Sequence, residues 1–318
     1  GIIVDVSKYF TNIIEVNKDE NWVRVQPGVI RDELNLYLKD YGLYFGPETS
    51  TANRAMLGGM VGNNSCGSNS LIYGSAREHT LEVKGFLSDG SFVHFKDLSF
   101  DEFIAKCQLE SLEGAIYKHI KTTLSDYNIQ EEIRNKFPKS TVKRRNTGYA
   151  IDMLLHSNPF TATDVPFNFC KLICGSEGTL VFITEIKLHV DSLPNKSSGL
   201  LCAHFNSIED ALMANLIVLN HQPLVSELMD SYILDCTKNN IAQNENRFFV
   251  EGDPAAILIV EYDGDDEKEI LTKIEAVKTD LLKDNLGYYF PVIFGADKRK
   301  VWNLRKAGLG LLSNTPGD

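Results

Sequence analysis

A glycine-rich segment at residues 46–67 constrains the fold of this chain more than any other feature. It holds five glycines among short polar residues and shows neither helical nor strand periodicity. Glycine at this density indicates backbone that bends sharply or approaches another group closely. Asn63, Asn64 and Ser65 add short hydrogen-bonding side chains beside that backbone. Because exposed N–H groups between glycines bind anionic oxygens, the segment predicts a cradle for a phosphate-containing ligand.

The glycine spacing differs from the common nucleotide-binding motifs. The sequence has no P-loop, and Gly308-Leu309-Gly310, which comes nearest to the dinucleotide fingerprint, lacks the third glycine and follows no strand. The residues around Ser65 do not form the G-x-S-x-G turn of a nucleophilic serine. A mobile surface loop is the alternative, but Met56 and Leu57 are apolar residues that such loops rarely carry. The segment therefore predicts a less common phosphate-binding design.

Three further motifs accompany this segment. In chain order the four are residues 46–74, which end in Tyr73-Gly74; Asn146-Thr147-Gly148-Tyr149; residues 175–184, which read GSEGTLVFIT; and Trp302-Asn303-Leu304-Arg305-Lys306. In order and spacing they resemble the vanillyl-alcohol-oxidase-type flavoproteins, in the branch of D-lactate dehydrogenases, glycolate oxidase subunits and D-2-hydroxyglutarate dehydrogenases. The resemblance covers essentially the whole chain. It is nearest to large bacterial members that join this flavin module to a C-terminal iron–sulfur region.

The resemblance implies a non-covalently bound FAD. The cofactor-binding residues that it implies are Pro47, Glu48, Thr49, Gly58, Gly59, Asn63, Asn64, Ser65, Gly67, Tyr73, Gly74, Glu177, Gly178 and Ile183. Gly58 and Gly59 would admit the pyrophosphate to the backbone, with tight loop packing as the alternative. Asn63 to Ser65 would bond the cofactor, with turn formation as the alternative. Val181 departs from the glycine usual in the family, and Cys66 is expected to fill space rather than to anchor the flavin.

The resemblance also implies a substrate side. Arg305 would bind the substrate carboxylate through two parallel hydrogen bonds, which lysine cannot offer; the alternative is a surface helix arginine. Tyr149 would line the substrate side of the flavin, with core packing as the alternative. The expected reaction is oxidation of a small anionic D-2-hydroxy acid to a 2-oxo acid, with electrons passing to a further acceptor. The alternatives are a flavoprotein oxidase or reductase of another substrate class, and an inactive fragment that binds no flavin.

The composition limits the classes of molecule that the chain can bind. A net charge of −11 argues against nucleic-acid binding. One basic cluster, made of Lys139, Lys143, Arg144 and Arg145, is either a solvated loop or an attraction for an anionic substrate or the pyrophosphate. No apolar stretch is long enough to span a membrane, which leaves peripheral association open.

The spacing of the cysteines does not match that of a metal-binding motif. No C-x-x-C occurs, so no metal site is expected, and any iron–sulfur cluster would belong to a downstream region outside this chain. Cys170 and Cys174 are expected in the core. Because nothing indicates a disulfide framework, a cytoplasmic location is expected.

The predicted fold class is α+β. Residues 1–193 are expected to form a two-lobed FAD-binding domain of mixed sheets and helices that lacks its N-terminal part. Residues 200–318 are expected to form a cap domain that lacks its C-terminal part. The polar linker at 194–199 separates them. Because the ends look like cuts, the chain alone is expected to be inactive, with the general base outside it.

The spacing of apolar residues and the turn signals predict the helices and strands. In the first part it predicts strands at 22–26, 172–173 and 180–188, helices at 30–41 (with Gly42 as C-cap) and 112–127, and a hairpin of 81–87 and 92–95. In the second part it predicts strands at 200–205, 225–229, 256–262 and 288–294, and helices at 208–219 and 267–282. This order, strand–helix–strand written twice, predicts a ferredoxin-like antiparallel sheet with helices on one face.

Overall fold

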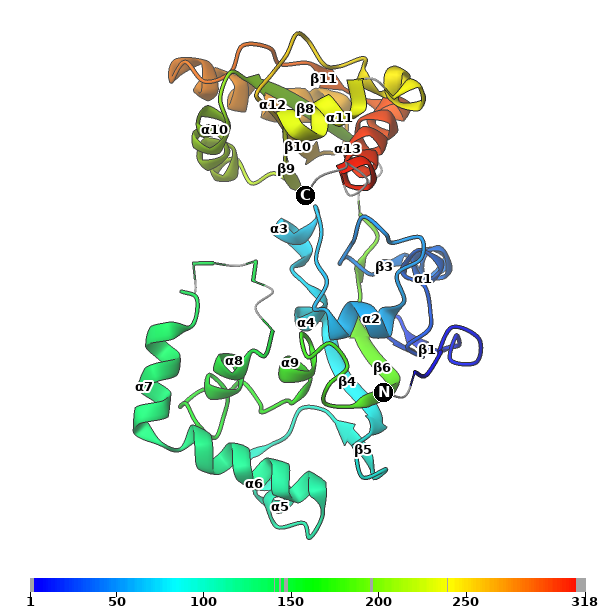
Figure 1. The fold of residues 1–318 in the computed structure, drawn as a ribbon, viewed down its shortest axis with the longest axis vertical. Helices are drawn as coiled ribbons and strands as arrows, with labels where there is room; N and C mark the ends of the chain where they lie inside the picture. Colours follow the sequence, from blue (N-terminus) through cyan, green and yellow to red (C-terminus); the bar gives the residue numbers. More distant parts are fainter. Residues whose placement is uncertain are drawn as a thin grey trace. The chain divides into compact units, whose positions relative to one another are not determined.

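The computed structural model describes residues 3–139, 141–142, 144–145, 148–194, 197–238 and 240–312. It divides into two compact units, Gly1–Leu193 and Pro194–Asp318, each with its own hydrophobic core (Figure 1). Both combine helices with antiparallel sheets, which confirms the α+β fold class. Asn146 and Thr147 of one motif, and Lys143 of the basic cluster, lie outside the described residues.

A five-stranded antiparallel sheet organises the first unit, in the order β1-β2-β6-β4-β5. Its strands are β1 (Ile13–Asn17), β2 (Trp22–Val25), β4 (Thr80–Phe86), β5 (Phe92–Phe95) and β6 (Phe182–His189). Alternate residues such as Val23, Val83 and Ile186 are fully buried. Their neighbours Arg24 and Glu82 form an ion pair of 3.0 Å on the other face. The period-two pattern of the sequence therefore sets which face enters the core.

Short helices surround this sheet. They are α1 (Arg31–Leu38), η1 (Lys39–Tyr41), α2 (Leu57–Gly62), α3 (Ser70–Tyr73), α4 (Ala76–His79), α5 (Phe100–Cys107), α6 (Leu112–Leu124), α7 (Tyr127–Lys136), α8 (Ile151–Leu155) and α9 (Cys170–Ile173). A two-stranded sheet joins β3 (Leu43–Tyr44) to β7 (Asp191–Ser192). Cys170 and Cys174 are fully buried, as expected.

Two details of this unit differ from the sequence prediction. Residues 172–173 were predicted as strand but lie in α9, because a short apolar run fits either period. The helix predicted over 112–127 ends at Leu124, and Asp126 begins a second helix by accepting the backbone N–H groups of Asn128 and Ile129. The cap at Gly42 is confirmed, with φ of 71°.

The second unit is built on a four-stranded antiparallel sheet, in the order β11-β8-β10-β9. Its elements are β8 (Ser198–Phe205), α10 (Ile208–Asn220), β9 (Val225–Asp230), α11 (Ser231–Lys238), η2 (Ile241–Arg247), β10 (Ala256–Asp263), α12 (Glu267–Lys283), β11 (Val292–Ile293), η3 (Gly295–Asp297) and α13 (Lys298–Leu312). The strand predicted over 288–294 is shorter than expected.

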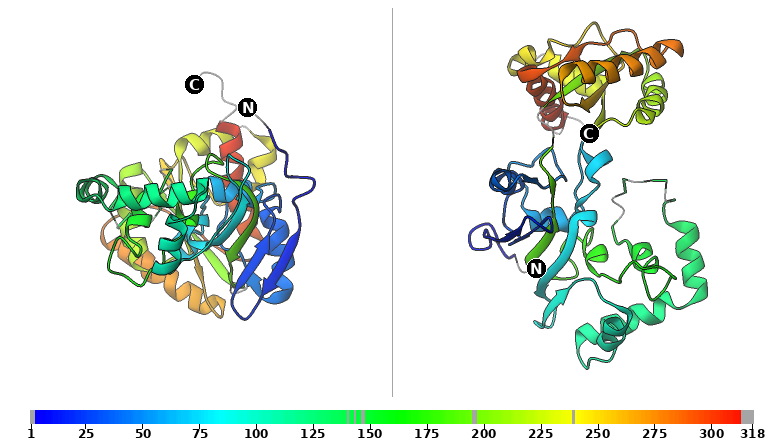
Figure 2. Two further views of the ribbon diagram at one scale, coloured as in Figure 1. Left: turned by 90° about the horizontal axis from the view of Figure 1, so that it is seen from below. Right: turned by 180° about the vertical axis from the view of Figure 1, so that it is seen from behind.

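Helices cover both faces of this sheet, so the expectation of one covered face was wrong. Leu201 and Leu258 pack in the cluster that includes residues of α10 and α12. Leu200 and Ile259, which point the opposite way, pack in the cluster that includes residues of α11 and α13. Figure 2 shows α12, in orange, running across its side of the sheet. The unbroken apolar runs of β8 and β10 are typical of strands buried on both faces.

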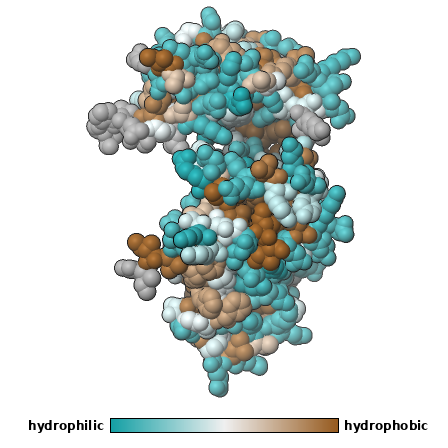
Figure 3. Space-filling view, turned by 90° about the vertical axis from the view of Figure 1, so that its right-hand side faces the viewer, coloured by the Kyte–Doolittle hydropathy of each residue, from teal (hydrophilic) through white to brown (hydrophobic). Residues whose placement is uncertain are grey.

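Hydrophilic residues dominate the face drawn in Figure 3, where hydrophobic residues gather in a patch on the first unit. Within the described ranges, no helix combines the length and apolar character needed to cross a membrane. The same ranges contain no group of three or more His, Cys, Asp or Glu side chains placed to hold a metal ion.

Candidate functional site

The two ends of the cradle at residues 46–67 lie close together, because Gly67 packs against Glu48, and Gly46 packs against Tyr73. A Cβ on Gly67 would lie 2.3 Å from the carbonyl oxygen of Glu48, and one on Gly46 would lie 2.3 Å from the ring of Tyr73. Only glycine allows the backbone to pack this closely. Gly46 and Gly67 are therefore needed for the packing of the cradle itself.

A buried arginine that the sequence analysis missed fixes the start of the cradle. Arg31, 5% exposed, donates from Nε to the carbonyl of Pro47 at 3.1 Å. Its Nη2 donates to the hydroxyl of Tyr44 at 2.8 Å. Glu48 accepts a hydrogen bond from Asn69 at 3.1 Å, and Thr49 Oγ1 lies 3.2 Å from Thr51 Oγ1. Pro47 to Thr49 are thus held mainly by contacts within the first unit.

Asn64 holds the turn at the end of the cradle. Its backbone is left-handed, with φ of 50°. Its Oδ1 accepts hydrogen bonds from Ser75 Oγ at 2.7 Å and from the N–H of Arg77 at 2.9 Å. The buried Ser65 accepts from Asn63 Nδ2 at 3.0 Å, while Asn63 itself is exposed. Asn64 therefore helps to form this turn, and Asn63 is the member of the trio that faces solvent.

The turn at residues 175–178 docks on α2. The N–H groups of Gly175 and Glu177 donate to the carbonyl of Gly62 at 3.0 and 2.9 Å. A Cβ on Gly62 would lie 3.5 Å from the Gly178 nitrogen, so the two backbones run in close contact. The structure thus brings together two motifs that lie far apart in the sequence.

Arg77 ties a third motif to this junction. Its side chain is 2% exposed and donates from Nε to the Lys171 carbonyl at 2.9 Å. Its Nη2 donates to the carbonyls of Gly148, at 3.1 Å, and Cys174. Burial lowers the pKa of Arg77, although a guanidinium stays protonated at neutral pH. Sequence reasoning missed Arg77 because a single arginine in the run Ser75-Ala76-Arg77-Glu78 matches no motif.

Four residues present exposed backbone or side chain at the junction of α2 and the turn: Gly59, Asn63, Glu177 and Gly178. We call this set the shelf. A Cβ on Gly59 or Gly178 would meet no atom within 4 Å. By contrast, a Cβ on Gly58 would lie 2.6 Å from the side chain of Pro27, and the Gly58 N–H donates to the Pro27 carbonyl at 2.8 Å. Gly58 therefore packs against a neighbouring loop, while Gly59 faces open space.

The other predicted residues lie around this junction. Tyr149 is 48% exposed, and its hydroxyl lies 2.7 Å from Thr179 Oγ1, so its ring is not part of the core. Ile183 pairs with Gly85 in the sheet and packs against the first core. Gly74 follows Tyr73 with φ of 65°.

The basic cluster is partly engaged by its neighbours. Arg144 donates from Nε to Cys66 Sγ at 3.1 Å. Arg145 forms an ion pair of 2.5 Å with the buried Asp152. The contact with Cys66 places Arg144 beside the cradle.

Arg305 belongs to α13 in the second unit. Its Nε donates to Glu227 Oε1 at 2.8 Å, and its Nη2 donates to the same oxygen. Its side chain is 28% exposed, so it is a partly buried, paired arginine rather than a free surface cation.

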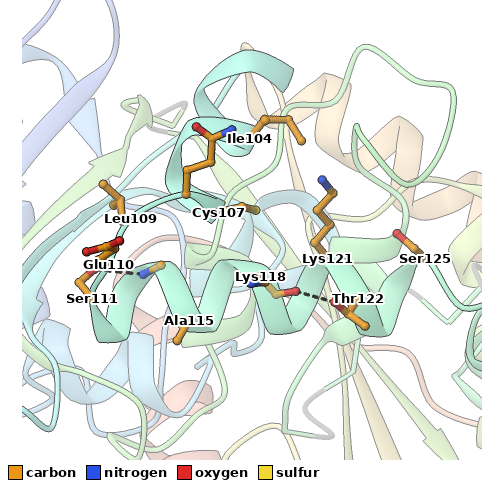
Figure 4. Close-up of a pocket in the computed structure, with 12 residues that line it drawn as sticks. Ile104, Cys107, Leu109, Glu110, Ser111, Ala115, Lys118, Lys121, Thr122 and Ser125 are labelled. Carbon is orange, nitrogen blue, oxygen red and sulfur yellow. Dashed lines mark hydrogen bonds between the residues drawn. The ribbon is translucent and has the colours of Figure 1, made fainter.

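Two hollows of the first unit contain none of the predicted site residues. One, of about 870 Å³, lies along α5 and α6, where Lys118 and Lys121 project from α6 (Figure 4). The other, of about 360 Å³, is lined by apolar residues that include Leu180 and Val181, just after the docked turn.

Comparison with known proteins adds independent information. Residues 1–96 match a family described as FAD binding domain, and residues 194–317 match one described as FAD linked oxidases, C-terminal domain. The chain is 32% identical over 328 residues to a D-2-hydroxyglutarate dehydrogenase of Pantoea ananatis, covering 100% of this chain and 31% of the relative. It is 33% identical over 327 residues to the enzyme of that name from Pseudomonas putida, with the same coverage.

More distant likenesses agree. A mitochondrial D-lactate dehydrogenase [cytochrome] of Kluyveromyces lactis is 25% identical, covering 97% of this chain and 42% of the relative. A solved structure of alkyldihydroxyacetonephosphate synthase matches with a TM-score of 0.57 and 16% identity, covering 95% of this chain and 45% of that chain. At this identity the structural match shows a shared fold. The chain spans 31% of the length of the D-2-hydroxyglutarate dehydrogenases that it matches.

Proposed function

The chain belongs to the family of FAD-linked oxidases and dehydrogenases, and on that premise we propose that the protein containing it oxidises a D-2-hydroxy acid to the 2-oxo acid. One observation carries the proposal: the full length of the chain matches D-2-hydroxyglutarate dehydrogenases at 32% and 33% identity. Among lactate, glycolate and 2-hydroxyglutarate, this match favours the last. Because the chain spans only 31% of those relatives, the activity is assigned to the whole protein.

The cofactor side of the proposal rests on the first unit, which carries the FAD-binding domain. The shelf fits a cofactor that must approach backbone closely, since a Cβ on Gly59 or Gly178 would fill open space. We propose that FAD binds without a covalent link and contacts the shelf. The other residues proposed to contact FAD are Pro47, Glu48, Thr49, Asn64, Ser65, Gly67, Tyr73, Gly74 and Ile183, and Gly58 supports them by packing.

The substrate side rests on the second unit. FAD, when bound, supplies the hydride acceptor, N5 of its ring. We propose that Arg305 binds the carboxylate of the hydroxy acid by charge-assisted hydrogen bonds, and that Tyr149 lines the substrate side of the ring. In this proposal residues 1–193 form the FAD-binding domain, and residues 200–318 form the cap domain, which holds the acid. Electrons leave to a separate acceptor, and any iron–sulfur cluster belongs to sequence outside this chain.

We further propose a cytoplasmic location, with peripheral membrane attachment as the alternative. All six cysteines are free thiols in the structure, which suits a reducing compartment.

The test uses the full-length protein. Its visible spectrum should show flavin, and acid precipitation should release the colour into the supernatant, since colour in the pellet would indicate a covalent link. A panel of D- and L-2-hydroxy acids with an artificial dye acceptor should show turnover of D-acids, with D-2-hydroxyglutarate preferred. Flavin reduction only by alcohols or amines without a carboxylate would refute the proposed substrate class.

A further inference from the structure

Two ion pairs join α13, drawn in red in Figure 1, to one face of the sheet in the second unit. Glu227 on β9 pairs with Arg305, and Glu261 on β10 pairs with Lys298. The two glutamate side chains are similarly buried, at 15% and 17% exposed. Both lie on the face that carries Met229 and Ile259 in an apolar cluster. Since a carboxylate beside apolar residues needs a partner, either pair could serve only to hold the helix.

Lys298 and Arg305 differ in whether a hydrogen-bond donor of the side chain remains unused. Lys298 donates to Ser198 Oγ and lies 3.4 Å from Glu261 Oε1, so both groups in its reach are part of the sheet. Arg305 gives Glu227 the Nε–Nη2 edge of its guanidinium. Within the described part of the chain, its Nη1 makes no hydrogen bond.

A guanidinium has two edges that can each offer parallel N–H groups to a carboxylate. With the Nε–Nη2 edge on Glu227, only the Nη1–Nη2 edge remains for a second anion. The partial exposure of Arg305, 28%, leaves this group accessible. Glu227 therefore limits both the orientation of the guanidinium and the direction from which an anion can bind it.

We propose that Glu227 is a positioning residue that turns the Nη1–Nη2 edge of Arg305 toward the carboxylate of the 2-hydroxy acid. The proposal rests on the proposed function, because it takes Arg305 as the carboxylate-binding residue. Glu227 does not touch the substrate in this arrangement. It fixes a long side chain that would otherwise lose conformational freedom on binding the acid.

The test compares Glu227→Ala, Glu227→Gln and the matched control Glu261→Ala in the full-length protein. In Glu227→Ala we expect KM for the hydroxy acid to rise about tenfold or more, the effect of about one charge-assisted hydrogen bond. The rise in KM should exceed the fall in kcat. Glu227→Gln should recover most of the loss, because its amide oxygen still accepts from Nε and Nη2. Glu261→Ala should leave KM within about twofold, as expected for contacts that only hold a helix.

A binding measurement separates positioning from damage to the fold. The dissociation constant of the 2-oxo acid product, measured by calorimetry, should rise in Glu227→Ala in parallel with KM, since it requires no turnover. An unchanged KM in Glu227→Ala, or equal rises in Glu227→Ala and Glu261→Ala, would overturn the positioning role and leave the proposed function standing. Absence of turnover of any 2-hydroxy acid by the unaltered protein would reject both.

Discussion

Replacing Asn64 should weaken the first unit, because its side chain and its backbone conformation both hold the end of the cradle. Its Oδ1 accepts two hydrogen bonds, from Ser75 Oγ at 2.7 Å and from the Arg77 N–H at 2.9 Å. Its φ of 50° also places it in the left-handed region, which asparagine tolerates better than alanine. The same substitution therefore removes two bonds and introduces backbone strain.

The two contributions can be estimated separately. Asn64→Ala leaves the buried Arg77 N–H without its acceptor, which costs about 1–3 kcal/mol, whereas the Ser75 hydroxyl keeps Glu78 Oε2 as an acceptor at 2.5 Å. Forcing alanine into the left-handed region adds about 1 kcal/mol. We therefore expect Asn64→Ala to lower the free energy of unfolding by about 2–4 kcal/mol. Asn64→Gly, which tolerates the backbone, should lose about 1–3 kcal/mol for the unpaired Arg77 N–H, together with a fraction of a kcal/mol of chain entropy.

Asn21 supplies a matched control within the same unit. It has φ of 55°, close to that of Asn64, and it lies in the turn between β1 and β2. Asn21→Ala should report the backbone strain alone, about 1 kcal/mol. The difference between the two alanine variants then isolates the side-chain bonds of Asn64.

The assay is denaturant unfolding of the flavin-free protein, followed by FAD titration of each variant. Because Asn64 bonds Arg77, and Arg77 holds the carbonyls of Gly148 and Cys174, the Asn64 variants should also bind FAD more weakly. Equal destabilisation by Asn64→Ala and Asn21→Ala would refute the reasoning, since it would mean that the bonds to Ser75 and Arg77 contribute nothing measurable.

Three further predictions follow from the same structure. Gly59→Ala should not destabilise the fold, because its Cβ would meet no atom within 4 Å and alanine is favoured over glycine within a helix, yet it should weaken FAD binding. Unaltered FAD affinity in the Gly59 variant would remove Gly59 from the proposed site. Gly67→Ala should instead destabilise the fold, because its Cβ would lie 2.3 Å from the carbonyl oxygen of Glu48. Burial raises the pKa of Glu82, but hydrogen bonds from His94, Arg24 and Lys187 outweigh it and lower the pKa from 4.5 to about 2. The stabilisation by this carboxylate is thus present above its ordinary pKa and lost as pH falls toward 2, so the gap in unfolding free energy between wild type and Glu82→Gln should close over that range; a gap that persists at the acid end would contradict this. Burial raises the pKa of the Cys170 and Cys174 thiols, that of Cys174 to about 11, so both should resist a thiol reagent until the protein unfolds; rapid titration of all six cysteines in the native state would count against it.

Local chemistry determined what the sequence could predict. The period-two pattern of residues 22–26 and 180–188 predicted strands that the structure contains as β2 and β6, because alternation fixes which side chains are buried. Gly42 predicted the end of a helix for a similar reason, since the left-handed conformation favours glycine. The four motifs indicated the flavin-linked family, which the comparisons confirm.

Other features depended on contacts between distant segments. Asn64 accepts a hydrogen bond from Ser75, and residues 175–178 dock on α2 through the carbonyl of Gly62. No local sequence pattern encodes either contact, so both appear only when the chain is folded. Arg77 and Glu227 carry no motif, and their importance comes from which carbonyls and cations the fold places beside them.

The division between sequence and structure follows from the range of the forces involved. Turn chemistry, periodicity and glycine spacing act over a few residues, and so the sequence by itself determined the fold class, the main elements and the family. Which glycine packs and which faces open space depends on what the tertiary structure brings against it. Gly58 and Gly59 are neighbours in sequence, yet a Cβ on the first would lie 2.6 Å from Pro27 and one on the second would meet nothing within 4 Å. Only the tertiary structure decided that difference, because both environments are made by segments outside the motif.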